Sequence, residues 1–255
     1  MTSLSICATN YDCAHALDRH LQSVYDNLGK FDFEYIVTDN HSKDASQAIL
    51  REWASRHGNF KVLTRRCTMG EGRQISFDHS RGAHIMVLDT DVVYSPLLKQ
   101  FLERYLERYE DFSVQALFCG IFPRNQWLQV GGRRSLNTNE DVDMWLRLVR
   151  LGTMRWYTVA MGENLKEPAA LGSSDHLSSR YTKGERVTRL FRREWDLLKT
   201  RRVQFVDLDR LIRESTIDFG LGVPIGPWPQ RRLRIGRSRR MAAFVRDLRQ
   251  VLRSS

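Results

Sequence analysis

Residues 1–160 alternate short apolar runs with longer stretches in which apolar positions recur every three or four residues. A short apolar run predicts a buried strand, and the longer spacing predicts a helix. The predicted strands are Leu4–Ala8, Glu34–Thr38, Phe60–Leu63 and His84–Leu88. The predicted helices are Asp12–Leu28, Lys43–His57, Glu71–Arg81 and Ser95–Tyr109. This alternation predicts an α/β fold with a Rossmann-like, mostly parallel sheet flanked by helices.

The pattern is less regular in the second half of the chain. It predicts the strand Ser113–Phe118, a turn at Gly131–Gly132, the helix Asn139–Leu151 and the strand Met154–Ala160. Residues 162–184 are rich in Gly, Ser and polar side chains, which predicts a mobile loop. The remaining predicted segments are a basic helix at Arg186–Lys199, an irregular connector at Phe219–Pro229 and a closing helix at Arg237–Ser255.

The net charge of +10 is unevenly distributed. Residues 180–255 carry 20 Lys+Arg against 8 Asp+Glu, a net charge of +12, so the preceding part of the chain is slightly acidic. A basic C-terminal third suits a nucleic acid, an anionic membrane surface or a phosphorylated substrate, and charge alone does not choose among them. The closing helix is amphipathic and flanked by arginines, so we expect it to pack on protein or to lie on an anionic membrane.

No run approaches the roughly 20 apolar residues that span a bilayer, and the first residues lack the pattern of a secretory signal. The four cysteines match neither a metal clip nor a disulfide framework. We therefore expect a reduced, cytoplasmic setting, with any membrane contact on the cytoplasmic face.

Polar residues end three of the predicted parallel strands, at Thr9–Asn10, Asp39–Asn40 and Asp89–Asp91. Ligands bind at the carboxyl ends of strands in such sheets, so these residues predict a nucleotide site along one edge. The paired carboxylates of Asp89–Thr90–Asp91 suit Mn²⁺ or Mg²⁺ shared with a diphosphate. A solvated turn is the alternative for the triplet alone, and the buried strand before it favours the metal. Asp39 is expected to contact a base or ribose, and Ser42 to cap the next helix.

Two further segments carry candidate chemistry. Gly70 and Gly72 precede Arg73, and this pattern permits close backbone approach and an arginine–phosphate pair, with a solvated arginine as the alternative. The acidic run at 139–143 begins a helix whose dipole accounts for one or two of the carboxylates. A carboxylate there is also suited to act as a general base toward an acceptor hydroxyl. Arg124 and Trp127, upstream, are candidates for shaping an acceptor pocket.

In their order and spacing these segments resemble family 2 glycosyltransferases with the GT-A fold. The resemblance covers roughly residues 3–160 and rests on SICATNYD, EYIVTDNHSKDAS, GEGRQISFDHSRGAHIMVLDTDVVY and WLQVGG followed by NEDVDMWLRLVRLG. The family's first strand usually ends in a Pro-Thr-x-Asn type of turn, and the proline is absent here. Implied domains are a GT-A core (1–160), a loop and basic helix completing the active site (161–218), and a connector with the basic helix (219–255).

The resemblance also implies roles for single residues. Thr9 would help to hold the base and Asp39 would contact the nucleoside, with Asn10, Asn40 and Thr90 beside them. Arg73 would lie near the donor, and Asp89 and Asp91 would bind metal and diphosphate, with Asp91 the more direct ligand. The pair Glu140–Asp141 would supply the general base, and Asp141 is favoured, with Glu140 or Asp143 as the alternative. His176 is the candidate for a third metal ligand, although a lone histidine in a polar loop is more often solvated.

The implied reaction is an inverting transfer from a UDP- or GDP-sugar to a glycan or polyprenyl-linked acceptor, with Mn²⁺ or Mg²⁺ as cofactor. A sugar-phosphate nucleotidyltransferase is the competing enzyme, but it would carry a Gly-rich basic signature after the first strand, where this chain has Ala8-Thr9-Asn10. A nucleic-acid-binding protein is the competing class, but the basic third lacks interleaved aromatics and any known module. A relative that binds the donor without transferring the sugar is the third alternative.

Overall fold

The computed structural model describes residues 4–136, 140–165, 184, 187–188, 217 and 219–221. Seven strands form the main sheet: β1 (Leu4–Asn10), β2 (Phe33–Asp39), β3 (Phe60–Thr64), β4 (His84–Leu88), β6 (Ser113–Leu117), β7 (Cys119–Pro123) and β8 (Met154–Ala160). Their spatial order is β3-β2-β1-β4-β7-β6-β8. Only β7 runs antiparallel to its neighbours β4 and β6, so the predicted mostly parallel sheet is confirmed.

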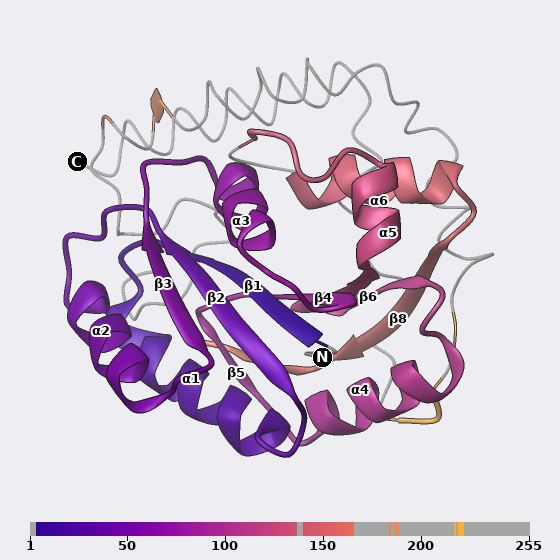
Figure 1. Ribbon diagram of the computed structural model, residues 1–255, viewed down its shortest axis with the longest axis horizontal. Coiled ribbons are helices and arrows are strands. Elements are labelled where there is room, and N and C mark those ends of the chain that lie inside the picture. Colours follow the sequence, from indigo (N-terminus) through magenta and orange to yellow (C-terminus); the bar gives the residue numbers. More distant parts are fainter. Residues whose placement is uncertain are drawn as a thin grey trace.

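Helices cover both faces of this sheet (Figure 1). One face carries α1 (Ala14–Leu28), α2 (Ser46–Arg56) and α4 (Leu97–Arg108). The other face carries α3 (Met69–Asp78), α5 (Arg124–Gln129) and α6 (Glu140–Arg150). In the described part of the chain no helix combines the length and the apolar character needed to cross a membrane.

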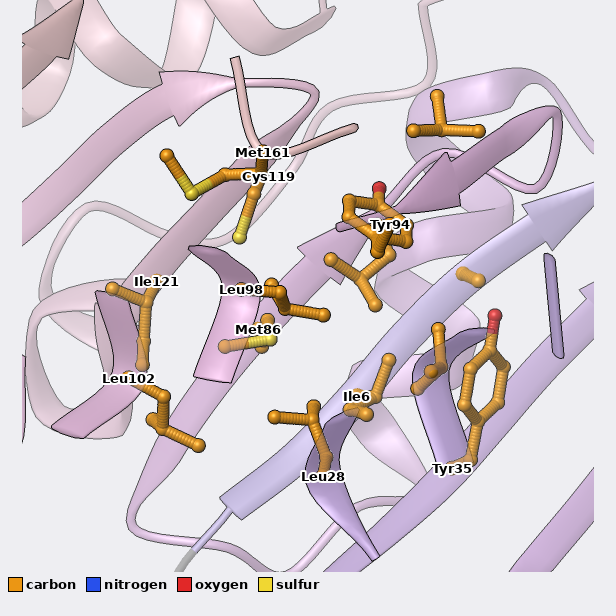
Figure 2. Close-up of a cluster of buried hydrophobic side chains, with 14 of the residues drawn as sticks. Ile6, Leu28, Tyr35, Met86, Tyr94, Leu98, Leu102, Cys119, Ile121 and Met161 are labelled. Carbon is orange, nitrogen blue, oxygen red and sulfur yellow. The ribbon is translucent and has the colours of Figure 1, made fainter. Parts of the chain in front are cut away.

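Alternate residues of the strands face opposite sides and build two separate cores. Ile6 and Ala8 of β1 join the core under α1, α2 and α4, here called the α1-side core, whereas Cys7 joins the core under α3, α5 and α6, the α3-side core. Figure 2 shows part of the α1-side core, where Ile6, Met86 and Leu98 lie among side chains of strands and helices. The α3-side core is built largely from aromatic and aliphatic residues around Trp127.

A second, two-stranded sheet pairs β5 (Val92–Tyr94) antiparallel with β9 (Gly162–Asn164). The backbone N–H of Leu165 extends this contact by donating to the carbonyl of Asp91 at 2.7 Å. Residues 162–164 therefore form a strand, not the start of the predicted loop, because the strand after the acidic triplet offers them a pairing edge.

Three differences from the predicted elements have local causes. The predicted strand at Ser113–Phe118 ends at Leu117, because Phe118 has φ +67° and turns the chain directly into β7. The third helix begins two residues early, at Met69, because Thr68 and Glu71 form a capping box. The strands β5, β7 and β9 and the helix α5 are additional elements.

Near the C-terminal end of the described residues, the chain returns to the α1-side core. Phe219 is buried and packs against Phe101, Tyr109 and Tyr157, with ring centroids 4.6–5.3 Å apart. The predicted connector therefore begins with a core residue. The predicted helices at Arg186–Lys199 and Arg237–Ser255 lie outside the described residues, apart from Val187 and Thr188.

Candidate active site

The ends of β1, β2 and β4 lie side by side at the carboxyl edge of the sheet, as predicted. Asn10 is in register with Asp39, and the backbone N–H of Asn40 donates to the carbonyl of Asn10 at 2.9 Å. The Thr90 hydroxyl approaches the carbonyl of Thr9 at 3.4 Å. The polar residues picked out at three separate places in the sequence therefore form one continuous rim.

The buried side chains of Asn10 and Asp39 hold the ends of β1 and β2 together at this rim. The amide of Asn10 donates to Oδ1 of Asp39 at 2.8 Å and to the hydroxyl of Ser42 at 3.1 Å, and both Asn10 and Asp39 are fully buried. The prediction that Ser42 caps the next helix is wrong. Its hydroxyl donates to Asp39 at 2.5 Å and accepts the N–H of Asp12 at 2.9 Å, while the residue before α2 is Ala45.

The acidic turn, residues 89–91, is fastened on both sides. The backbone N–H of Asp89 donates to the hydroxyl of Tyr94 at 3.1 Å, and that hydroxyl donates to the carbonyl of Phe118 at 2.7 Å. Asp89 and Asp91 are only half-buried, whereas Thr90 between them is buried. Two carboxylates are therefore held at the rim and remain reachable from outside.

A buried histidine supports the strand that follows the acidic turn. His20 is fully buried, and its Nδ1 lies 2.8 Å from the carbonyl of Val92, so Nδ1 carries the proton and donates. Its Nε2 then accepts the hydroxyl of Tyr35 at 2.7 Å. Burial lowers the pKa of His20 to about 4, so the ring is neutral at physiological pH.

Helix α3 approaches the rim closely because two glycines open its first turn. A Cβ on Gly72 would lie 2.7 Å from the side chain of Thr9. A Cβ on Gly70 would lie 2.2 Å from the carbonyl of Arg134 and 2.9 Å from Cβ of Glu140. Packing rather than helix propensity therefore decides these two positions, and it places Arg73 between the rim and α6.

Arg73 joins the two acidic segments that the sequence separates. Its Nη2 donates to Oδ1 of Asp89 at 2.6 Å, and its Nη1 donates to Oε1 of Glu140. The side chains of Arg73 and Glu140 are 9% and 4% exposed, against 38% for Asp89. The acidic turn of β4 and the first turn of α6 thus meet on one guanidinium. The alternative interpretation of Arg73 as a solvated surface arginine is therefore wrong, and its contact with a phosphate stays a prediction.

Burial, together with neighbouring charges, raises the pKa values of two carboxyl groups in this site. Burial is the largest cause that raises the pKa of Asp89 to about 6, with Asp91 and Glu140 adding to the rise and Arg73 opposing it. Burial, and then Glu140, raise the pKa of Asp141 against the opposing effect of Arg133 and Arg73. Raised carboxyl pKa values in one cluster are typical of functional sites.

Arg133 is the member of the cluster that the sequence did not reveal. Its side chain is 2% exposed, and its Nη1 lies 3.5 Å from the Glu140 oxygen that Arg73 also contacts. The carboxamide oxygen of Gln74 accepts the backbone N–H of Arg133 at 2.8 Å and the indole N–H of Trp127 at 3.0 Å. These bonds fix the backbone of Arg133. The contact between Arg133 and Gln74 joins segments that share no local sequence pattern. The turn predicted at Gly131–Gly132 was the nearest sequence signal.

Two other candidates near α6 are structural. Asp143 is buried and bonded to Arg134 at 3.1 Å and to Arg147 at 2.7 Å, so it stabilises the helix rather than facing a substrate. Arg124 does not shape an acceptor pocket. It donates to the carbonyl of Gly82 at 2.6 Å, next to the start of β4 and at the opposite edge of the sheet from the acidic turn.

Asp89 and Asp91 are the described residues that fit a divalent cation. Within the described part of the chain, no cluster of three or more His, Cys, Asp or Glu side chains forms a closed metal site. Two half-buried carboxylates at the rim, without a protein cage, suit Mg²⁺ or Mn²⁺, which share their coordination with phosphate oxygens and water. His176, the predicted third ligand, lies outside the described residues.

A family model described as glycosyl transferase family 2 matches residues 5–164, which is more than half of the chain. That span contains all the rim and cluster residues described above.

Solved structures with the same fold include the following three. TarS 1-349 from S. aureus in complex with UDP-GlcNAc has a TM-score of 0.58 at 13% identity, covering 74% of this chain and 66% of that one. The mannosyltransferase PcManGT from Pyrobaculum calidifontis in complex with GDP-Man and Mn²⁺ has a TM-score of 0.55 at 14% identity, with 98% and 72% covered. Glucosyl-3-phosphoglycerate synthase from Mycobacterium tuberculosis has a TM-score of 0.52 at 13% identity, with 66% and 73% covered. The chain spans 57% of the length of the TarS 1-349 chain bound to UDP.

Proposed function

Because the chain belongs to glycosyl transferase family 2, we propose that it transfers a sugar from a nucleotide-diphospho-sugar to an acceptor hydroxyl or phosphate, with inversion at the anomeric carbon. UDP- and GDP-sugars are the proposed donors, since similar structures carry UDP-GlcNAc and GDP-Man. The proposed acceptor is a glycan or a polyprenyl phosphate, and the basic C-terminal third supports an anionic or membrane-bound acceptor.

One observation carries this proposal. Arg73 bonds both to Asp89, at the end of a parallel strand, and to Glu140, in the first turn of α6. Donor binding needs oxygen ligands at a strand end, and transfer needs a carboxylate near the acceptor. One buried arginine therefore connects the carboxylate at the strand end with the carboxylate of the helix, although Asp89 and Glu140 lie some fifty positions apart in the sequence.

Asp91 and Asp89 are the residues that would hold the divalent cation. When bound, the cation would supply positive charge for the departing diphosphate. PcManGT was solved with Mn²⁺, which supports Mn²⁺ as the first ion to test.

Asp141 is better suited than Glu140 to act as the general base. Glu140 is buried and has two arginines on its Oε1, so its position is fixed and the lone pairs of that oxygen are engaged. Asp141 is only partly buried, and its raised pKa makes it a stronger proton acceptor. We propose that Asp141 takes the acceptor proton as the acceptor oxygen attacks the anomeric carbon. The bond from that carbon to the diphosphate breaks as the new bond forms, and the diphosphate leaves with the electron pair.

The test is a screen of UDP- and GDP-sugars for hydrolysis and for protection against thermal unfolding, with Mn²⁺ or Mg²⁺ and with EDTA. We expect one donor to be hydrolysed only with metal. Asp91→Ala should abolish the metal dependence, and Asp141→Asn should lower transfer by at least about a hundredfold while donor binding stays, since general bases contribute on this scale.

The exposed Asp26→Asn, on α1 at the opposite face of the sheet from α3 and α6, is the matched control and should behave as wild type. Full transfer by Asp141→Asn would refute its assignment as the base. Failure of every UDP- and GDP-sugar to bind in the presence of either metal would refute the proposed donor class.

A further inference from the structure

Two buried arginines share one carboxylate oxygen at the junction of α3 and α6. Nη1 of Arg73 and Nη1 of Arg133 both point to Oε1 of Glu140, and all three side chains are less than one-tenth exposed. Among the described residues, the Nε atom of neither arginine has a hydrogen-bond partner. Glu140 therefore faces two arginines, and Arg73 has a second contact, with the half-buried carboxylate of Asp89.

The second contact of Arg73 conflicts with donor binding as proposed above. A cation held by Asp89 and Asp91 would occupy the carboxylate that Arg73 now contacts, and two positive groups on one carboxylate repel each other. The diphosphate that arrives with the cation offers new acceptors for a guanidinium. Arg73 is placed to leave Asp89 for the diphosphate, and the cost of this exchange depends on what happens at Glu140.

A buried carboxylate that loses its only cation is strongly destabilised. Arg133 removes this problem because it keeps Glu140 paired when Arg73 turns away. Its backbone is held by Gln74, and its guanidinium lies 5.6 Å from the ring centre of Trp127, so it stays in place independently of Arg73. Gly132, at φ +67°, makes room for Gln74, whose Oε1 would lie 2.2 Å from a Cβ at that position.

We propose that Arg133 is a positioning residue that holds Glu140 so that Arg73 can exchange Asp89 for the diphosphate of the donor. The inference rests on the proposed function, because it presumes a nucleotide diphosphate at the acidic turn. It assigns Arg133 no contact with the substrate. Its effect on donor binding should pass through Arg73.

The test is a double-mutant cycle on nucleotide affinity, measured by calorimetry with UDP and with GDP, each with saturating Mn²⁺. Arg133→Gln should weaken binding about tenfold, because Glu140 then retains Arg73. In an Arg73→Gln background the same change should alter the affinity less than about twofold, since coupled residues are not additive. A tenfold loss in both backgrounds, or in neither, would overturn the inference.

Arg134→Gln is the matched control. Arg134 is the next residue and also pairs with a carboxylate, but that carboxylate is Asp143, outside the cluster. Its affinity should stay within about twofold of wild type. Arg133→Lys, which keeps the charge, should lose less than about threefold, and a loss as large as that of Arg133→Gln would mean that charge is not the cause.

Two outcomes separate this inference from the proposed function. If wild-type protein binds neither UDP nor GDP with Mn²⁺, the proposed donor class is wrong, and the inference falls with it. If wild type binds one of them and Arg133→Gln binds it equally well, only the inference is wrong. If Arg133→Gln does not unfold cooperatively, it is not properly folded, and Arg133→Lys takes its place in the cycle. The smaller loss of nucleotide affinity in Arg133→Lys must then disappear in the Arg73→Gln background.

Discussion

The two helix layers cover the same sheet with different kinds of side chain. On the α1 side, strands and helices bury a continuous apolar core, and the buried histidine in it has both ring nitrogens bonded. On the α3 side, the apolar core is smaller and ends at a cluster of buried charge around Glu140. Because neighbouring residues of one strand face opposite sides, a sheet can supply stability with one face and hold charged groups with the other.

This comparison predicts that substitutions in the α1-side core lower the free energy of unfolding and leave nucleotide affinity unchanged. Phe101 is fully buried, stacks on Tyr157 and packs against Phe219. Phe101→Ala should lower the free energy of unfolding by about 3–5 kcal/mol, the usual cost of removing a buried aromatic ring. Urea unfolding measures it, and nucleotide affinity of the folded fraction should not change. A loss below about 1 kcal/mol would show that the core closes over the gap.

The second prediction uses pH to distinguish the two faces. Unfolded chain protonates His20 near its ordinary value of 6.5, whereas the native state does so only near 4, so the native state binds fewer protons in between. Stability from this group is present above pH 6.5 and is lost as the pH falls toward 4. Between pH 7 and pH 4.5 the loss should be about 2–3 kcal/mol, and His20→Gln should abolish it.

The exposed His79→Gln is the control for this experiment and should keep the wild-type pH dependence.

Asp89, beside the charged cluster around Glu140, has the opposite effect on the pH dependence of stability. Its pKa is raised to about 6 in the native state, so its protonation favours the folded protein as the pH falls below that value. Asp89→Asn should therefore steepen the acid loss of stability. If it flattens the curve instead, the raised pKa is wrong.

The smallest predicted effect is the difference in stability between two neighbouring glycine substitutions, which tests the packing that holds the charged cluster. Gly131 and Gly132 both have positive φ, but only Gly132 would bring a Cβ against another residue, Gln74. Gly131→Ala should cost about 1 kcal/mol from backbone strain. Gly132→Ala should cost about 1–2 kcal/mol more because Gln74 must move. Thermal unfolding measures both, and equal losses would mean that Gln74 yields freely.

The sequence anticipated the parts of the molecule that have a local pattern. The apolar runs of β1, β2 and β4 and the carboxylates after β4 follow from strand periodicity and from where parallel strands end. Phe118 was missed because a bulky residue gives no turn signal, yet it turns the chain at φ +67°. The start of α3 was misplaced because Gly70 and Gly72 have poor helix propensity and are retained for close packing.

The charged cluster could be predicted only in part. Arg73, Asp89 and Glu140 were each identified, but their mutual contacts depend on the approach of α3 to α6, which no local pattern encodes. Arg133 and Tyr94 were missed for the same reason. They act through Gln74 and through Phe118, which lie far away in sequence, so a single sequence offers no signal that pairs them.

The fastening of the acidic turn has a consequence for how the protein is made. Within the described part of the chain, β5, directly after Asp91, pairs with β9 alone, some seventy residues later. His15 closes a span of 150 residues by contacting the carbonyl of Leu165. Closing such long loops is slow compared with forming local helices. On the ribosome, the first three parallel strands can therefore be complete while the turn still waits for its partner, so catalytic competence should appear only after Leu165 has left the exit tunnel.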